Sequence, residues 1–469
     1  MKLKRIMIAA PKSGSGKTTI TCALLQALKN EGERVVSYKC GPDYIDPLFH
    51  KKVIGVPSRN LDSFFTGEEM TRQIFLKDRT EEDFAVLEGV MGLFDGLGGV
   101  SEEGSSYHIA KITKTPVILV VDAKGMGQSV IPLIAGFMAY DKERLIKGVI
   151  LNRMHKPYFE TIKPLIEKEL NINVLGYFPD KKDLNIESRH LGLVLPDELS
   201  DIKAQLADAA EELAKTVSVE AIREIAESAE ALVGLGSGQI TRTQESTFLK
   251  TEADGFINHE RPVIAVAMDE AFCFYYEDNL RMLKDFGAQI KYFSPLYDKG
   301  LPDGCDALLL GGGYPELYAD KLSGNLSMRG AVKKAFDSGM PVVAECGGFM
   351  YLHSAITDKD GISYDFAGVI PAVCSYKGKA VRFGYIEVKE KRSIFMPDGE
   401  VIRGHEFHYY DSTNNGDDCL AVKPSTGKTY SCVIEGENYW LGFAHLYYPS
   451  NPSFAEAFVK KAAIYNRRL

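Results

Sequence analysis

The stretch Val-Val-Ala-Glu-Cys-Gly-Gly, residues 342–348, decides how the second half of the chain is interpreted. Its apolar residues follow a proline and end at a cysteine and two glycines, a pattern that predicts a buried strand and a tight turn. Small residues, Ala344 and Gly348, lie two positions before and two after Cys346. A nucleophile elbow requires this spacing, because its sharp strand-to-helix turn has no room for bulky neighbours. Cys346 is therefore a candidate nucleophile, and the alternative is a buried core cysteine.

Four histidines are candidates for the base that a nucleophilic cysteine needs: His353, His405, His408 and His445. His353 is expected on the helix after the elbow, where a surface role is favoured. His405 and His408 belong to a polar cluster, residues 403–408, that suits the binding of an anion. We expect the base to be His445, because it follows an apolar run at a strand end and could reach the nucleophile from there. Spacing alone makes it the best of the four.

A second glycine-rich turn, Gly311–Gly313, ends another expected strand at residues 307–310. Backbone N–H groups in such turns stabilise the negative charge that develops on a carbonyl oxygen under nucleophilic attack. We assign this oxyanion hole to Gly312, Gly313 and Gly347.

The composition is that of an ordinary globular protein, with 45% hydrophobic and 25% charged residues. A chain of 469 residues is too long for one core, so two domains are expected. The net charge of −9 argues against general affinity for nucleic acid. No apolar run is long enough to cross a membrane. The eight cysteines form no CxxC pair, which argues against a zinc site or a disulfide framework and favours the reducing cytoplasm.

The first half alternates between strands and helices. Apolar strands are predicted at residues 5–10, 34–39, 84–88, 116–122, 148–152 and 174–178, with a helix at residues 19–31. Near-continuous apolar strands separated by helices indicate a parallel sheet that is covered on both faces. We predict an α/β domain at residues 1–231, a linker at 232–260 and a second domain at 261–469. The tail of the second domain is expected to add short, mostly antiparallel strands at the edge of its sheet.

A P-loop lies between the first strand and the first helix, in the sequence Lys-Ser-Gly-Ser-Gly-Lys-Thr-Thr at residues 12–19. Its glycines let backbone N–H groups surround phosphate oxygens, and its lysine reaches the β- and γ-phosphates of ATP. Pro11 replaces the usual first glycine, and Lys12 makes this the variant with an extra lysine. The alternative, a turn that only caps a helix, is disfavoured by the neighbouring strand and amphipathic helix. The predicted ATP-binding residues are Lys12, Gly14, Ser15, Gly16, Lys17, Thr18, Thr19 and Asn152, whose amide could contact adenine.

Acidic residues follow the neighbouring strands at the same edge of the predicted sheet, where ligands bind in open α/β folds. Magnesium prefers hard oxygen ligands and keeps several waters. We predict that Thr18, Asp43 and Glu88 hold Mg²⁺, with Asp95 and Asp122 as further candidates. For Asp46 and Asp95 a capping role alone is the alternative.

Taken together, these motifs resemble the cobyrinic acid a,c-diamide synthase family, which amidates a vitamin B12 precursor with glutamine. The resemblance covers nearly the whole chain and includes the P-loop, the elbow and the stretches 41–44, 58–64, 88–93, 189–193, 310–318, 382–385 and 403–408. It implies a dethiobiotin-synthetase-like ATP domain followed by a flavodoxin-like class I glutamine amidotransferase domain with a mixed sheet. Most class I glutaminases carry a glutamate two residues after the catalytic histidine, but here that residue is Tyr447, as in the subfamily resembled.

The resemblance implies an ATP- and glutamine-dependent ligase that phosphorylates a substrate carboxylate and transfers ammonia to it, so the two domains are expected to face each other. The implied substrates are cobyrinate, L-glutamine and ATP with Mg²⁺. No nucleic acid or membrane partner is expected, and a homodimer is possible because Lys12 resembles the extra lysine of dimeric partition ATPases. Candidates for binding the substrate carboxylates are Asp46, Arg59, Asp95, Arg189, His190, Arg382, Arg403, His405 and His408. For each arginine taken alone, a surface ion pair is the alternative.

Two other functions stay open at this point. A nickel sirohydrochlorin a,c-diamide synthase would use the same chemistry on a related tetrapyrrole. A MinD-like ATPase switch with an inactive glutaminase-like domain is the alternative from a different class. The cysteine, glycine turn and histidine argue against that switch, as does the lack of an amphipathic tail.

Overall fold

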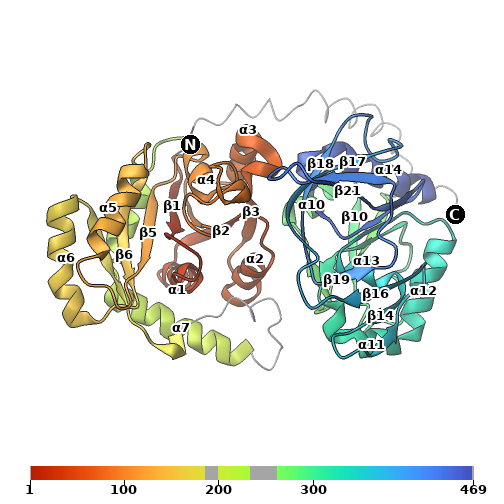
Figure 1. The fold of residues 1–469 in the computed structure, drawn as a ribbon, viewed down its shortest axis with the longest axis horizontal. Helices are drawn as coiled ribbons and strands as arrows, with labels where there is room; N and C mark the ends of the chain where they lie inside the picture. The colour runs from red at the N-terminus through yellow and green to blue at the C-terminus, as the bar shows by residue number, and fades with distance from the viewer. Residues whose placement is uncertain (1, 185–198, 233–260, 467–469) are drawn as a thin grey trace. The chain divides into compact units, whose positions relative to one another are not determined.

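The computed structural model describes residues 2–184, 199–232 and 261–466. The chain divides into two compact units, Met1–Arg242 and Thr243–Leu469 (Figure 1). Almost all of the predicted linker lies outside the described residues.

The first unit is built on a seven-stranded parallel sheet in the order β3-β2-β4-β1-β5-β6-β7. Its strands are β1 (Lys4–Ala9), β2 (Arg34–Cys40), β3 (Ser58–Leu61), β4 (Asp83–Glu88), β5 (Val117–Asp122), β6 (Ile146–Asn152) and β7 (Asn173–Phe178). The predicted parallel α/β fold is confirmed, and the six predicted strands differ from the observed ones by one or two residues at their ends. Strand β3 was not predicted, because Ser-Arg-Asn-Leu contains no apolar run and lies at the sheet edge.

Helices cover this sheet: α1 (Lys17–Asn30), α2 (Ile45–Phe49), α3 (Ser63–Leu76), α4 (Ser106–Ile112), α5 (Val130–Tyr140), α6 (Lys156–Leu170), α7 (Leu199–Thr216) and α8 (Val219–Glu227). One face of the sheet packs against α1, α7 and α8 in a single apolar core that includes Ile6 and Ile8 of β1. This packing fixes the start of α1 directly above the carboxyl end of β1.

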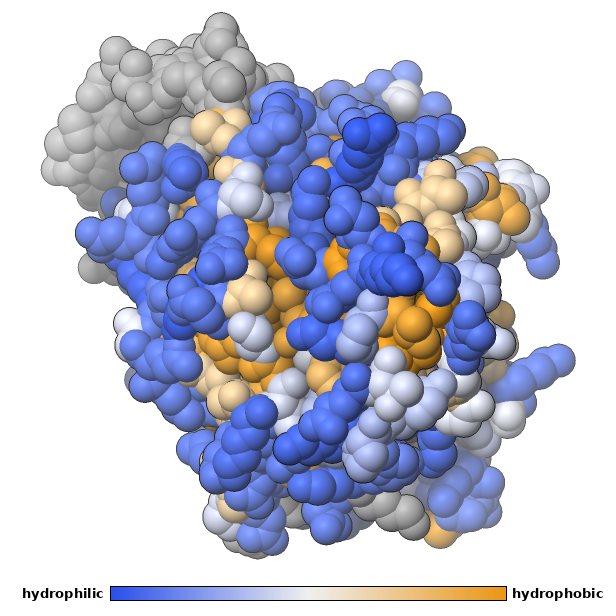
Figure 2. Space-filling model, turned by 90° about the vertical axis from the view of Figure 1, so that its left-hand side faces the viewer, coloured by the Kyte–Doolittle hydropathy of each residue, from blue (hydrophilic) through white to orange (hydrophobic). Residues whose placement is uncertain are grey.

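Helix α5 exposes uncharged, mostly apolar side chains on the surface. It contains no charged residue between Val130 and Tyr140, yet only Val130, Ile131 and Ile134 are buried. Tyr140 is 64% exposed. Figure 2 views the side of the molecule that carries α5 and α6 and shows hydrophobic residues gathered between hydrophilic ones. None of the described helices is both long and apolar enough to span a bilayer.

The second unit contains a six-stranded mixed sheet in the order β10-β8-β11-β13-β23-β22, parallel except for β22. These strands are β8 (Val263–Ala267), β10 (Gln289–Phe293), β11 (Ala307–Leu310), β13 (Val342–Glu345), β22 (Ile434–Gly436) and β23 (Tyr439–Gly442). The helices are α10 (Glu277–Asp285), α11 (Ala319–Gly324), α12 (Leu326–Asp337), α13 (Gly347–Tyr351) and α14 (Pro452–Asn466). Two apolar cores lie on the two faces of the sheet. The predicted amidotransferase-like α/β fold is thereby confirmed.

Of two further expectations about the second unit, one is confirmed only in part and the other is wrong. The tail strands extend the main sheet only in part: β23 and the antiparallel β22 join its edge as expected. The others, β17 (Arg382–Glu390), β18 (Ile402–His408), β20 (Cys419–Val422), β21 (Thr429–Cys432) and β24 (His445–Leu446), form a separate antiparallel sheet. His353 is neither helical nor on the surface. Helix α13 has only five residues, and His353 begins strand β14 (His353–Thr357), where it is buried and hydrogen-bonded to Phe349 O at 2.8 Å.

Candidate active sites

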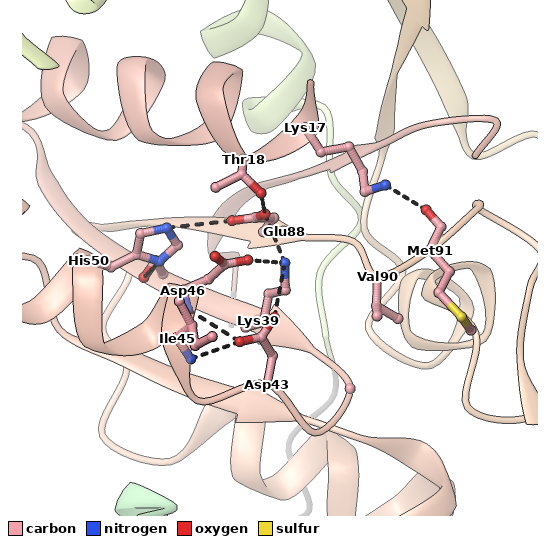
Figure 3. A network of polar contacts seen from close by, with 12 residues as sticks. Lys17, Thr18, Lys39, Asp43, Ile45, Asp46, His50, Glu88, Val90 and Met91 are labelled. Atoms are coloured by element: carbon pink, nitrogen blue, oxygen red, sulfur yellow. Dashed lines mark hydrogen bonds and ion pairs between the residues drawn. The ribbon is translucent and has the colours of Figure 1, made fainter. Parts of the chain in front are cut away.

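The P-loop connects β1 to α1 at the carboxyl edge of the parallel sheet. Lys17 Nζ donates to Met91 O at 2.5 Å, and Thr18 Oγ1 donates to Glu88 Oε1 at 2.7 Å (Figure 3). Gly16 has a φ of 91°, and a Cβ there would lie 2.1 Å from Asn152 Nδ2, so only glycine fits. The Asn152 amide, predicted to contact adenine, donates to Ser15 O at 2.8 Å. Lys12, Gly14, Ser15 and Thr19 lie in the same turn and first helical turn.

A buried charge network lies directly beneath the P-loop. Lys39, at the end of β2, is in register with Glu88 on β4, so both side chains project from the same face of the sheet. Lys39 Nζ lies 2.8 Å from Glu88 Oε1, contacts Asp46 Oδ2, and lies 3.9 Å from Asp43 Oδ2 (Figure 3). His50 Nε2 lies 3.5 Å from the other Glu88 oxygen. One ammonium group is therefore surrounded by three carboxylates.

Burial and mutual charge determine the protonation of this network. Burial alone would raise the pKa of Glu88, but Lys39 and His50 outweigh it and hold the pKa below its usual range. Burial, and then the charge of Glu88, raises the pKa of Asp46 well above its usual value. Burial, and then the charge of Lys39, lowers the pKa of Lys17 to about 8. A phosphate anion would relieve the repulsion between the two lysines.

The donors at this edge fit a magnesium ion that takes most of its ligands from phosphates and water. Thr18 and Glu88 present adjacent oxygens beside the P-loop. Asp43 uses Oδ1 to accept from Ile45 N at 2.8 Å, so its Oδ2 faces Lys39. No cluster of three or more His, Cys, Asp or Glu side chains that could hold a metal occurs within residues 2–184, 199–232 and 261–466. Mg²⁺ in phosphate sites commonly uses only one or two carboxylates.

In the second unit, three neighbouring parallel strands end at one place. Leu310 of β11 is in register with Ala344 of β13, and Glu345 of β13 with Gly442 of β23. The turns that follow contain Gly311–Gly313, Cys346–Gly348 and residues 443–445. The fold therefore brings the predicted oxyanion glycines, cysteine and histidine to one sheet edge.

Cys346 occupies a strained turn between β13 and α13. Its φ is 46° and its ψ −104°, a conformation that costs a non-glycine residue energy. Cys346 N donates to Gly442 O at 2.9 Å, and Gly348 N donates to Gly311 O at 2.9 Å. A Cβ at Gly348 would lie 2.1 Å from Leu310 O, which is the physical reason for the small residue that the elbow pattern requires.

The glycine turn contacts the predicted base and lies beside the turn that carries the predicted nucleophile. A Cβ at Gly312 would lie 2.2 Å from His445 Cε1, so the imidazole ring lies against this glycine. A Cβ at Gly347 would lie 3.1 Å from Gly313 N. His445 begins β24, directly opposite His405 of β18. Two residues later, where other glutaminases carry an acid, Tyr447 donates its hydroxyl to Asp278 Oδ2 at 3.2 Å.

Burial keeps both predicted catalytic groups neutral. It lowers the pKa of His445 to about 3, with His405 and His408 adding to the effect. Burial, and then the nearby Glu316 carboxyl, raises the pKa of the Cys346 thiol well above its usual value. The thiol proton must therefore move as the sulfur attacks, and the neutral imidazole is a group that can accept it.

The predicted substrate-binding residues are spread over both units. Asp46 lies in the Lys39 network, and Asp95 Oδ2 accepts from Gly92 N at 2.9 Å near Lys17. The other metal candidate, Asp122, pairs with Arg153 Nε at 2.8 Å. Arg59 is buried on β3 and donates to Lys77 O at 3.5 Å. Arg189 and His190 lie outside the described residues.

The remaining substrate candidates lie on β17 and β18. Arg382 lies 4.0 Å from the Tyr430 ring centroid and 3.5 Å from Glu406 Oε1, and Arg403 Nε donates to Glu387 Oε1 at 2.9 Å. His408 stacks on Phe443 with ring centroids 4.0 Å apart. His405, the remaining candidate on β18, is the register partner of His445 on β24.

Sequence reasoning missed Lys39, His50 and Glu316. Lys39 carried a usable signal, because a lysine near the end of a strand predicted to be buried on both faces needs a partner. Glu316 follows the predicted oxyanion glycines, and within the motif at residues 310–318 it carried no separate signal. His50 carried no signal, since its partner Glu88 is distant in sequence.

Comparison with known proteins places both halves in described families. Residues 6–194 match the CobQ/CobB/MinD/ParA nucleotide binding domain, and residues 263–451 match the CobB/CobQ-like glutamine amidotransferase domain. Similar proteins named cobyrinate a,c-diamide synthase include that of Thermoplasma volcanium, 38% identical over 100% of this chain and 99% of the relative. That of Picrophilus torridus is 39% identical over 98% and 99%. That of Caldanaerobacter subterraneus is 36% identical over 98% and 99%. With this identity over its full length, the chain belongs to the cobyrinate a,c-diamide synthase family.

Proposed function

We propose that this chain amidates the a and c carboxylates of cobyrinate in cobalamin biosynthesis, with ATP as energy source and glutamine as nitrogen donor. The reaction follows from membership of the family. The observation that supports the assignment of residues is the convergence of three strand ends on Cys346, His445 and Gly312, together with a P-loop in the other unit.

In the glutaminase half, Cys346 attacks the side-chain amide carbon of glutamine while His445 accepts the thiol proton. The backbone N–H groups of Gly313 and Gly347, with the turn at Gly312, stabilise the oxyanion. Collapse of the tetrahedral intermediate releases ammonia, with the imidazole returning the proton to the leaving nitrogen. Water then hydrolyses the thioester to glutamate and restores the thiol.

In the ATP half, a substrate carboxylate oxygen attacks the γ-phosphorus, giving an acyl phosphate and ADP. The carboxylate must be activated because its carbon is a poor electrophile, whereas the acyl phosphate has phosphate as a leaving group. Lys17 and Lys39 supply positive charge where the phosphates bind. Ammonia displaces phosphate and forms the amide.

Thr18 and Glu88, with Asp43 nearby, would hold Mg²⁺ through hard oxygens. When bound, the ion neutralises charge on the transferred phosphoryl group. The chain's own contribution is to keep Glu88 ionised through Lys39 and His50.

The cationic side chains of Arg59, Arg382 and Arg403, with Arg189 and His190, are proposed to bind the carboxylates of the tetrapyrrole, because guanidinium groups bind carboxylates with two parallel hydrogen bonds. Asp46, Asp95, His405 and His408 are proposed to line the same regions.

We further propose a cytoplasmic homodimer. The eight cysteines are buried and unpaired, which fits a reducing compartment. The uncharged face of α5 can pair with its own copy, since a two-fold interface needs a self-complementary patch.

The deciding experiment incubates the protein with ATP, Mg²⁺ and glutamine, and with either cobyrinate or nickel sirohydrochlorin, and measures product mass. We expect two carboxylates of cobyrinate to be converted to amides. Conversion of nickel sirohydrochlorin alone would contradict the proposed substrate, and no conversion of either would contradict the reaction.

A further inference from the structure

Glu316 lies beside the nucleophile in a position that the reaction described above does not use. It follows the oxyanion glycines, in the short 3-10 helix Pro315–Tyr318. The Pro315 ring lies against the nucleophile turn, 2.9 Å from where a Cβ of Gly347 would be. Burial, and then the charge of the Glu316 carboxyl, raises the pKa of the Cys346 thiol and of the Tyr410 hydroxyl.

Within the part of the chain that the structure describes, this carboxyl has no cation to balance it. Among the described residues, no ion pair or side-chain hydrogen bond reaches Glu316, and no lysine or arginine contributes to its protonation. Burial raises the pKa of its carboxyl to about 7. The residue as a whole is partly buried. Acids in such surroundings are normally paired, because desolvating an unpaired carboxylate is unfavourable.

We propose that the Glu316 carboxylate binds the α-ammonium group of glutamine and thereby selects the free amino acid as nitrogen donor. This inference rests on the proposed role of Cys346 as the glutaminase nucleophile. When Cys346 holds the side-chain amide, the α-nitrogen of an extended glutamine lies about 5 Å from the amide carbon, from standard bond lengths. A single carboxylate near the nucleophile can therefore serve the other end of the ligand. The ammonium supplies the missing counter-charge, and an amide without an α-ammonium leaves the carboxylate unpaired.

The test compares glutamate release from glutamine with hydrolysis of glutaramate, the same amide without the α-amino group. Glu316→Gln should raise the KM for glutamine roughly 10- to 150-fold, the usual effect of losing one hydrogen bond to a charged group, with kcat nearly unchanged. The preference of the wild type for glutamine over glutaramate should shrink by the same factor. Glu316→Asp, which keeps the negative charge, should recover part of the preference for glutamine.

Asp320→Asn is the matched control, since it removes an exposed acid four residues away and should leave KM unchanged. Amidation driven by ammonium chloride should be unchanged in Glu316→Gln, which shows that the variant is folded. The role of Glu316 would be overturned by an unchanged KM for glutamine. It would also be overturned if Glu316→Gln lowered the hydrolysis of glutamine and of glutaramate by the same factor. If wild-type protein released no glutamate at all, the proposed glutaminase function would fail instead.

Discussion

Replacing Gly312 by alanine should disable the glutaminase reaction alone. Gly312 has no positive φ that would exclude alanine, so the backbone tolerates the change. The new methyl group would lie 2.2 Å from His445 Cε1, 3.1 Å from Nδ1 and 3.2 Å from Nε2. Ordinary van der Waals contact starts at 3.4 Å, so the imidazole must move by about 1.2 Å.

A displacement of about 1 Å in a catalytic group costs roughly 100-fold in rate, because the proton acceptor no longer lines up with the nucleophile. We therefore expect glutamine-dependent glutamate release by Gly312→Ala to fall about 100-fold. Amidation of cobyrinate with ammonium chloride should continue at the wild-type rate, since it needs neither Cys346 nor His445.

Gly330→Ala is the matched control. Gly330 lies in α12 with no atom within 4 Å of the added methyl group, and alanine is favoured in a helix. It should leave both activities unchanged. Glutamate release by Gly312→Ala within threefold of the wild type would refute the placement of His445 as the base.

The other predictions concern the nucleophile, the P-loop, the buried network and pH. Cys346→Ser should abolish glutamine-driven amidation and leave ammonia-driven amidation intact; loss of both together would make the cysteine structural. Lys17→Ala should abolish both glutamine-driven and ammonia-driven amidation, measured as amide formation, because no acyl phosphate forms. Surviving ammonia-driven activity would contradict the ATP assignment. Lys39→Met should lower the free energy of unfolding in urea by about 3–5 kcal/mol, because Glu88 and Asp46 lose their buried cation. Lys156→Met, at an exposed lysine, is the control. A decrease in the unfolding free energy of Lys39→Met below about 1 kcal/mol would contradict the role of Lys39. Finally, kcat/KM for glutamine should fall as pH drops below about 7, because Glu316 is ionised only above its raised pKa of about 7, whereas the lowered pKa of His445, about 3, keeps that base neutral. In Glu316→Gln this decline should disappear, and a decline that persists would assign it to another group.

Local patterns were sufficient for the parts of each site that one segment builds. The P-loop and the elbow each combine a strand end, glycines and one functional residue within eight residues, so their geometry follows from neighbouring φ and ψ angles. Alternation of apolar runs likewise identified six of the seven strands of the first sheet. The short polar strand β3 was missed because it is defined by its pairing with β2, which no local pattern records.

The sequence by itself determined the fold class, the P-loop and the strained turn at Cys346, because these depend on short-range periodicity and on where glycine is needed. Only the tertiary structure decided which groups act on one another. Lys39 and Glu88 are 49 residues apart and meet because β2 and β4 are adjacent, and His445 reaches Gly312 because β11, β13 and β23 end together. Burial then set their charges, since removal from water, rather than residue type, moves the pKa of His445 and of Glu316 away from their ordinary values.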